Sequence, residues 1–369
     1  MSFLDVGIPV PTMRISSWLG PGRWQNRLVI AVVLLVLVLY LYETYDISVR
    51  RNAVKASSHS KINLDHDATE AAFPTVNLVV SSRLKDDISW TENLRIPNLS
   101  IVRYVSDYLD AEFHPPIANR GHEALVYHTY FHDFYDNLPD ISILIHGHET
   151  SWHVEDMFNR SMTFALSHLD LNEILQRQYF NLRVRWDGAC PAWNTTFERR
   201  PDDPEKPEKL YEAFSENFAT YDVPEMLGGP CCSQFAVTRD AIRRNSQAQY
   251  RRTMDWFMQT GWDDSITGRV WEHMWPWLFT GEPVDCPMQF QTYCQMYHIC
   301  FEQDAAILVD ELAQEKKILK EQITIPSELL NPQRGQDARK RLKVIESLMQ
   351  TELGTALERG RNGSSSRLV

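Results

Sequence analysis

The chain has 369 residues, and its 37 Lys and Arg against 49 Asp and Glu give a formal net charge of −12. Hydrophobic residues make up 43% and charged residues 23%, a composition typical of globular proteins and not of disordered or collagen-like ones. The acidic balance argues against nucleic acid as a partner, because such proteins usually present a basic surface to the phosphates.

An uncharged run near the N-terminus predicts a membrane anchor. It extends from Leu28 to Tyr42, between Arg27 and Glu43. As a helix it would span about 22 Å, shorter than the ~30 Å core of a bilayer, so flanking aromatic residues would have to extend it. A cleavable signal peptide is the alternative, but the run starts late and no small-x-small cleavage pattern follows. We expect residues 1–27 to be cytosolic and residues 28–42 to cross the membrane once.

Cysteines and glycosylation motifs indicate the compartment of the remaining chain. All six cysteines follow the apolar run, as do four N-x-S/T motifs, at Asn98, Asn159, Asn194 and Asn362. They favour a type II glycoprotein of the endoplasmic reticulum or Golgi, whose luminal part forms up to three disulfides in any of 15 pairings. Six free thiols in a cytosol-facing domain are the alternative. A structural zinc site is not expected, because no C-x-x-C spacing occurs.

The chain then divides into a stem, a body and a tail. Residues 43–74 are polar and predict a stem. Over 75–300 we expect strands at 75–82, 98–105, 141–145 and 231–238, and helices at 122–137, 239–260 and 265–279, the last interrupted at Pro276. The strand–helix–strand order predicts an α/β, Rossmann-type sheet with ligands at the carboxyl ends of its strands. Residues 301–369 predict an amphipathic helical tail, with helices at 304–322 and 336–359 and a flexible end from Gly363, as a surface for oligomerisation.

An ordered series of short blocks in the body resembles a known family. The blocks are Leu78-Val79-Val80-Ser81 with Ser89-Trp90, Gly121-His122-Glu123, residues 135–140 (YDNLPD), His146-Gly147-His148, residues 231–237 (CCSQFAV), and Gly268-Arg269-Val270 with Glu272, Trp275 and Phe279. Together they resemble the fungal family catalogued as domain of unknown function 3431 over about residues 75–300. The resemblance implies a membrane-anchored relative of GT-A glycosyltransferases. This chain has Gly121-His122-Glu123 where the family pattern has Gly-Arg-Glu, and its helical tail has no counterpart there.

The turn after the predicted strand at 141–145 is the first candidate site. Metal-dependent GT-A enzymes place Asp-x-Asp there to hold a divalent ion against the donor diphosphate, but this chain has His146-Gly147-His148-Glu149. We expect His146 and His148 to lie beside the phosphates of a nucleotide sugar, binding them directly or through a metal. The alternative is that both are polar loop residues that cap the strand.

Three further acidic residues are candidates: Glu123 as a second catalytic residue, and Asp86 and Asp87 as residues that bind the nucleotide. Glu123 begins the predicted helix at 122–137, where backbone N–H groups stabilise a carboxylate, and either caps the helix or binds an acceptor hydroxyl. Asp86 and Asp87 follow the first predicted strand, the place where nucleotide-binding α/β proteins contact base or ribose, although surface loop acids are common. His128 and His132 share a helix face, but their aromatic neighbours favour packing over a metal site.

Glu272 is the candidate catalytic base. It lies among Trp271, Trp275 and Trp277, and burial beside aromatic rings raises the pKa of a carboxyl group toward the range of a general base. The alternative is a Trp-rich core in which an arginine such as Arg269 pairs with it. The sequence therefore predicts a luminal transferase that moves a sugar from a nucleotide sugar to a hydroxyl of a glycan, lipid or small molecule, with metal dependence left open. A non-catalytic, membrane-anchored binding or scaffold protein with the same fold is the alternative function.

Overall fold

The computed structural model describes residues 73–186, 190, 193–194, 207–323 and 332–365. The predicted anchor at 28–42 and nearly all of the predicted stem lie outside these residues. Among the described helices, none is both long and apolar enough to cross a membrane.

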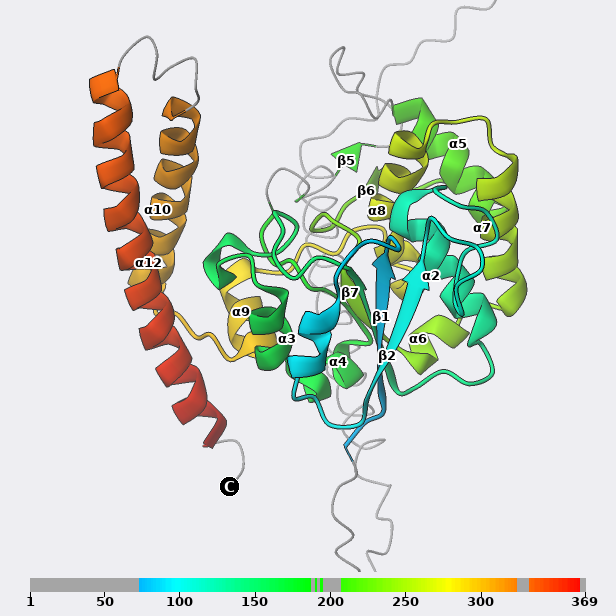
Figure 1. Ribbon diagram of the computed structural model, residues 1–369, viewed down its shortest axis with the longest axis horizontal. Coiled ribbons are helices and arrows are strands. Elements are labelled where there is room, and N and C mark those ends of the chain that lie inside the picture. The colour runs from blue at the N-terminus through cyan, green and yellow to red at the C-terminus, as the bar shows by residue number, and fades with distance from the viewer. Residues whose placement is uncertain (1–72, 187–189, 191–192, 195–206, 324–331, 366–369) are drawn as a thin grey trace, which may run out of the picture. The chain divides into compact units, whose positions relative to one another are not determined.

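A mixed five-stranded sheet forms the centre of the body (Figure 1). Its strand order is β2-β1-β3-β7-β4, in which β1 pairs in parallel with both β2 and β3, and β7 runs antiparallel to its neighbours β3 and β4. The strands are β1 (Val76–Ser82), β2 (Leu99–Val105), β3 (Ile141–His146), β4 (Tyr179–Asn181) and β7 (Phe235–Thr238). A separate pair joins β5 (Trp193–Asn194) to β6 (Met226–Leu227).

The central strands are mostly apolar because both faces of the sheet are covered. Side chains alternate along a strand, so Leu78 and Ile143 enter one hydrophobic cluster while Val79 and Leu144 enter the other. All four are fully buried. A strand buried on both faces needs apolar residues at most positions, which is why β1 and β3 are recognisable from sequence.

Helices form a layer on each face of the sheet, as Figure 1 shows. One face is covered by α2 (His122–Asp133), α5 (Pro207–Phe218), α6 (Arg239–Arg243), α7 (Gln247–Gln259) and α8 (Asp264–Thr280). The other carries α3 (Met162–His168), α4 (Leu171–Arg177) and α9 (Gln289–Tyr297), with the short 3-10 helices η1 (Ser89–Asn93) and η2 (Asp156–Phe158) on the connecting segments. The α/β fold class predicted from the sequence is confirmed at this level.

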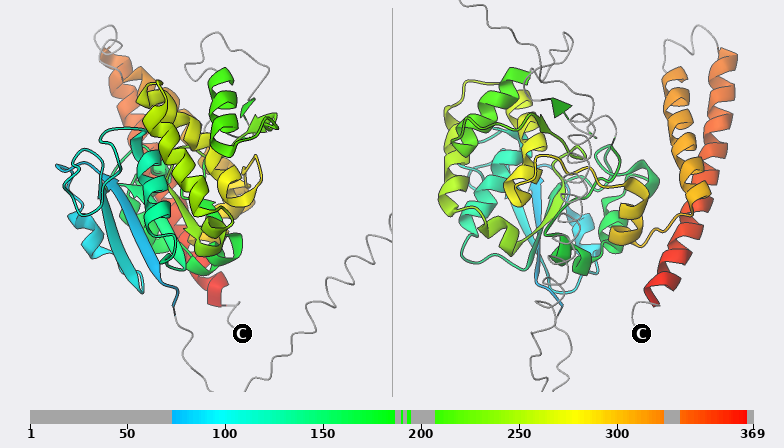
Figure 2. Two further views of the ribbon diagram at one scale, coloured as in Figure 1. Left: turned by 90° about the vertical axis from the view of Figure 1, so that its right-hand side faces the viewer. Right: turned by 180° about the vertical axis from the view of Figure 1, so that it is seen from behind.

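Two long helices follow the body, α10 (Gln303–Gln322) and α12 (Pro332–Ser365), and lie side by side in Figures 1 and 2. Arg341 and Glu315 join them through two hydrogen bonds of 2.7 Å. Apolar residues of both helices, among them Leu312 and Met349, belong to the hydrophobic cluster on the α9 face of the sheet. Arg359 also donates to the carbonyl oxygen of Cys300. The helices predicted for the tail are therefore present and pack on the body, while its boundary and its role in oligomerisation stay predictions.

Several predicted bounds differ from the structure. The helix expected at 122–137 ends at Asp133, and that at 239–260 is divided into α6 and α7 around Asn245. Pro276 lies inside α8 without interrupting it. A proline removes one backbone hydrogen bond of a helix, but the buried aromatic side chains of α8 hold this helix in the hydrophobic cluster. The strand predicted at 231–238 begins only at Phe235. The flexible end predicted from Gly363 is helical as far as Ser365.

All six cysteines are paired. The disulfides join Cys190 to Cys286, Cys231 to Cys232 and Cys294 to Cys300. The sequence predicted up to three disulfides without fixing their pairing, and the structure selects one of the 15 arrangements. One of the three joins neighbouring residues and lies beside the candidate site.

Candidate functional site

The candidate site lies at the edge of the sheet where the parallel strands end. Ser81 of β1 is paired with His146 of β3, so these strands end side by side. Because β7 runs the other way, its first residue, Phe235, enters the sheet near this edge, opposite Leu144. The segment before β7 thus meets the turn after β3, as expected for ligand sites in open α/β sheets.

Glu123 reaches this edge from the first turn of α2. The helix begins after Gly121, whose φ of +66° is a left-handed conformation that favours glycine, and a Cβ atom there would meet the ring of Phe257 at 2.4 Å. The Gly121 N–H donates to Asp264 Oδ1 at 2.8 Å. These contacts fix where α2 starts and therefore where the Glu123 carboxylate lies.

Glu123 and His146 face each other and form an ion pair when His146 is protonated. Oε2 of Glu123 lies 3.6 Å from Nε2 of His146, and only 15% and 16% of the two side chains are exposed. Burial opposes ionisation of Glu123, but attraction to a protonated His146 and hydrogen bonds to the carboxylate outweigh it, so that the pKa of Glu123 lies below its usual value. The carboxylate is therefore ionised at neutral pH, and it orients the imidazole of His146.

A second histidine extends this pair. Nδ1 of His146 lies 3.3 Å from Nδ1 of His153, and Nδ1 of His153 also lies 3.4 Å from Oγ of Ser151. Burial, together with repulsion from a proton on His146, lowers the pKa of His153 to about 4, so it is neutral at pH 7. Glu123, His146 and His153 thus make a row of carboxylate, imidazole and imidazole.

A buried glutamine fixes the backbone of both histidines. Gln234, only 2% exposed, accepts the His146 N–H at Oε1 over 3.1 Å and donates from Nε2 to the carbonyl oxygen of His153 over 3.5 Å. Because one rigid amide bridges the two segments, the imidazoles keep their mutual position.

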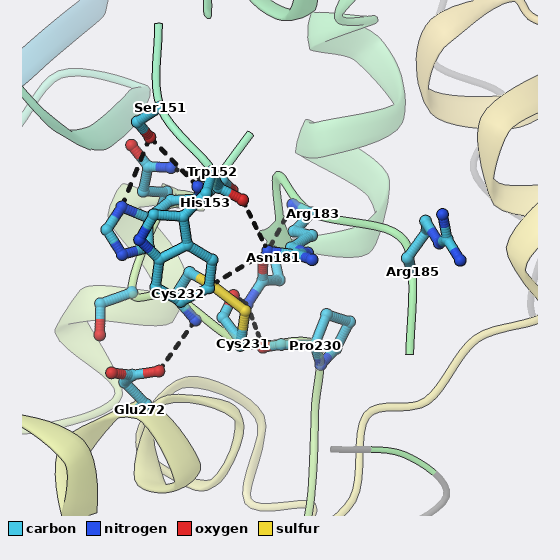
Figure 3. The surroundings of a disulfide bond; sticks show 12 residues. Ser151, Trp152, His153, Asn181, Arg183, Arg185, Pro230, Cys231, Cys232 and Glu272 are labelled. Carbon is cyan, nitrogen blue, oxygen red and sulfur yellow. Dashed lines mark hydrogen bonds between the residues drawn. A yellow bond between two sulfur atoms is a disulfide. The ribbon is translucent and has the colours of Figure 1, made fainter. Parts of the chain in front are cut away.

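Glu272 meets the same segment from α8. Its Oε2 accepts the backbone N–H of Cys232 at 3.1 Å, next to the disulfide with Cys231 (Figure 3). Cys232 has a φ of +89°, which is uncommon outside glycine. Both the disulfide and the hydrogen bond to Glu272 hold this residue in that conformation. Figure 3 shows the Glu272 carboxylate pointing toward the disulfide, on whose other side lie Trp152 and His153.

Arg183 brings a positive charge to the disulfide. Its Nη1 donates to the carbonyl oxygen of Trp152 at 3.0 Å and to Sγ of Cys232 at 3.4 Å. Its guanidinium carbon lies 5.8 Å from the centre of the Trp152 ring, and 60% of Trp152 is exposed. An exposed indole beside a cation and two histidines is a surface on which a sugar ring or a base can stack.

The remaining predicted site residues have less central positions. His148 is exposed, whereas His146 turns toward Glu123 and His153. A charge on His148 makes a small contribution to the lowered pKa of His153. Asp86 and Asp87 lie in the loop after β1, where they accept the backbone N–H groups of Arg83 and Ser89 at 2.8 Å. The structure thus brings Glu123, His146 and Glu272 to one edge, and the binding roles of His148, Asp86 and Asp87 stay predictions.

Within the described residues, no group of three or more His, Cys, Asp or Glu side chains is arranged to hold a metal ion. His128 is fully buried, with its ring 4.1 Å from that of Trp271 and 5.1 Å from that of Trp275, centre to centre. His132 is partly exposed near the end of α2, with Nδ1 3.3 Å from Asp133. The sequence-based preference for packing over a metal site is therefore confirmed for His128, which lies among aromatic rings.

Four residues of this edge were not chosen from the sequence: Trp152, His153, Arg183 and Gln234. Trp152 and His153 stand only a few residues beyond His146, so the signal for them was a polar aromatic turn after a buried strand. Arg183 and Gln234 come from segments far along the chain, and only the pairing of β7 with β3 brings Gln234 to the histidines.

Comparison with known proteins identifies the family but no reaction. A family model described as "Protein of unknown function (DUF3431)" matches residues 78–295. The chain belongs to this family. No curated protein and no solved structure matches it. The matched region runs from β1 into α9 and contains every residue of the candidate site, whose chemistry has to be argued from its geometry.

Proposed function

We propose that this member of the family is a glycosyltransferase that moves a sugar from a nucleoside diphosphate sugar to a hydroxyl acceptor. The observation that carries the proposal is the gathering of the Glu123–His146–His153 row, Glu272 and Arg183 at the carboxyl edge of the parallel strands. Such a reaction needs a base for the hydroxyl, a positive environment for the leaving diphosphate, and a surface for the sugar ring.

The described side chains divide among these tasks. Arg183 supplies positive charge for the diphosphate, the turn that carries His146 and His148 borders the donor phosphates, and Trp152 supplies the stacking surface. Glu272 is the sequence-based candidate for the base. The described residues do not form a three-ligand metal site, so no step is assigned to a metal, and dependence on a divalent cation is an outcome of the experiment below.

A luminal location and a single N-terminal anchor belong to the same proposal. Its support is the pairing of all six cysteines, since disulfides persist in oxidising compartments. Protease protection in intact microsomes tests it: residues 73–369 should survive digestion until detergent is added. Digestion without detergent would contradict the luminal orientation.

A non-catalytic binding protein is the alternative function. It is favoured by the lack of Asp-x-Asp after β3 and by the hydrogen bonds that engage Asp86 and Asp87 within their own loop. Such a protein would bind a ligand at the same edge without breaking the bond between the sugar and the diphosphate.

Release of nucleoside diphosphate distinguishes the two functions. The detergent-solubilised full-length chain is incubated with a panel of nucleotide sugars and hydroxyl acceptors, with and without Mn²⁺. We expect acceptor-dependent release by the wild type and at least a hundredfold lower rate in the double variant Glu272→Gln/His153→Gln. The matched control, Glu282→Gln/His132→Gln, changes the same residue types away from the edge and should keep the wild-type rate. Binding of a donor without release would favour the alternative.

A further inference from the structure

The row of Glu123, His146 and His153 suggests a proton pathway distinct from the predicted base. Nε2 of His146 faces the carboxylate of Glu123, and Nδ1 of His146 faces Nδ1 of His153. Two nitrogens 3.3 Å apart share a hydrogen bond only if one of them carries the proton. When His153 carries it, Nε2 of His153, on the other side of its ring, is the unprotonated nitrogen.

We propose that His153 is the base that takes the proton of the acceptor hydroxyl, and that His146 and Glu123 form a relay that stabilises the resulting positive charge. This assignment rests on the proposed glycosyl transfer, whereas the relay itself does not. His153 is the catalytic residue, and His146 and Glu123 act through it.

The proposed step balances in atoms and charge. The hydroxyl proton goes to Nε2 of His153, and the proton on Nδ1 of His153 moves to Nδ1 of His146. The acceptor oxygen bonds to the anomeric carbon of the sugar, while the bond from that carbon to the diphosphate oxygen breaks and its electron pair leaves with the nucleoside diphosphate. The new cation lies on His146, beside the ionised Glu123.

The charged groups around the histidines support this direction of transfer. Burial, a proton on His146, and the charges of Arg183 and His148 disfavour a cation on His153, whereas Glu123 favours one. Because the ionised Glu123 lies next to His146, the positive charge is more stable on His146 than on His153. Tyr127 also faces Glu123, but burial holds the pKa of its hydroxyl well above its usual value, so it stays neutral.

Glu272 is less suited to be the base. Its Oε2 already accepts the N–H of Cys232, and a hydrogen bond to the ionised form of a carboxylate makes it a weaker base. The rigid support of the histidines by Gln234, by contrast, is an arrangement expected of groups that must keep a fixed distance during proton transfer.

The relay can be tested without any activity. Histidines labelled with ¹⁵N in the full-length protein are titrated by NMR, and His146 and His153 should take up one shared proton. In Glu123→Gln the midpoint of this uptake should fall by about one pH unit, because the carboxylate no longer stabilises the cation. Glu123→Asp keeps the negative charge, so its midpoint should lie close to that of the wild type. Glu315→Gln, a paired carboxylate on α10, is the control and should leave the midpoint unchanged.

The role of base is tested by kinetics on the same proteins. His153→Gln should lower kcat at least a hundredfold with KM changed less than threefold, and Glu123→Gln should move the acid limb of the pH profile of kcat about one unit lower. Glu272→Gln should keep that limb in place and lose less than tenfold in kcat. A wild-type kcat in His153→Gln would overturn the base assignment, and separate, unshifted titrations of His146 and His153 would overturn the relay. A wild type that transfers no sugar while the shared titration is present would reject the proposed function and keep the relay.

Discussion

Nε1 of Trp90 donates a hydrogen bond of 2.9 Å to the carbonyl oxygen of Gly147. This bond ties the segment after β1 to the turn after β3, so the loop with Asp86 and Asp87 and the turn with His146 are held together. Gly147 is itself closely packed, because a Cβ atom at this position would meet Cβ of Ser82 at 2.9 Å. The geometry of the candidate site therefore depends on a glycine whose carbonyl oxygen anchors Trp90 and whose Cα leaves no room for a side chain.

Gly147→Ala should disturb both the site and the fold. The added methyl group has to displace Ser82 on the neighbouring strand, which we expect to cost about 1–3 kcal/mol of the free energy of unfolding. Gly261→Ala is the control, since a Cβ atom there meets nothing within 4 Å. Denaturant unfolding of both variants checks this, and an equal stability of the two would contradict the close approach.

His128 should make the protein sensitive to acid. Burial lowers the pKa of this histidine well below its usual 6.5, and among the described residues neither ring nitrogen has a hydrogen-bond partner. The unfolded chain binds a proton below pH 6.5 that the folded chain does not, so stability is lost as the pH falls through that value, by about 2 kcal/mol between pH 7 and pH 5.

His128→Leu should remove this part of the pH dependence. The leucine has a similar volume and leaves no buried polar atom without a partner, so we also expect it to raise the free energy of unfolding at pH 7 by about 1 kcal/mol. Unfolding curves at pH 5 and pH 7 for wild type and variant give both values. A variant with the wild-type pH dependence would show that His128 is not held neutral.

Two of the three disulfides should differ in how much they contribute to the free energy of unfolding. Cys190 and Cys286 are 96 residues apart, and Cys294 and Cys300 only 6, so loop-closure entropy predicts losses of about 5 and about 2 kcal/mol when each pair is replaced by serine. Denaturant unfolding of the two double variants measures the difference. A larger loss for the short loop would contradict the entropic account.

Trp152→Ala should weaken ligand binding without affecting folding. The indole is 60% exposed and lies beside His153 and Arg183, so its removal takes away contact surface for a ligand and little packing. We expect binding of the donor or acceptor to weaken about tenfold, or about 1.4 kcal/mol. Tyr221→Ala, at a side chain 90% exposed, is the control. Unchanged affinity for both substrates would exclude Trp152 from the site.

The sequence predicted those parts of the fold whose signal is local. β1 and β3 are short, mostly apolar runs, and α10 and α12 have clear amphipathic spacing, so all four were predicted within a few residues, apart from the last turns of α12. The short β4 and the small helices α3 and α4 were not predicted, because three to seven residues carry too little periodicity. The division between α6 and α7 was missed for the same reason.

The site was predicted in part for a related reason. Glu123, His146 and Glu272 stood out through their positions at a helix start, a strand end and a tryptophan cluster. The contact of His146 with His153, and the bridge made by Gln234, depend on how distant segments meet across the sheet, which no local pattern contains. The neighbouring cysteines were visible in the sequence, but only the structure shows that their disulfide lies between Glu272 and Arg183.

Donor binding by the full-length protein tests the central claim most directly, namely that these residues form one site for a nucleotide sugar. In a thermal-shift measurement at a hundredfold excess over Kd, one nucleoside diphosphate sugar should raise the Tm of the wild type by about 5 °C. The same shift should appear in Glu315→Gln and be about half as large in Trp152→Ala, whose affinity we expect to be tenfold weaker. A panel in which no nucleotide sugar changes the Tm, with or without Mn²⁺, would contradict the account.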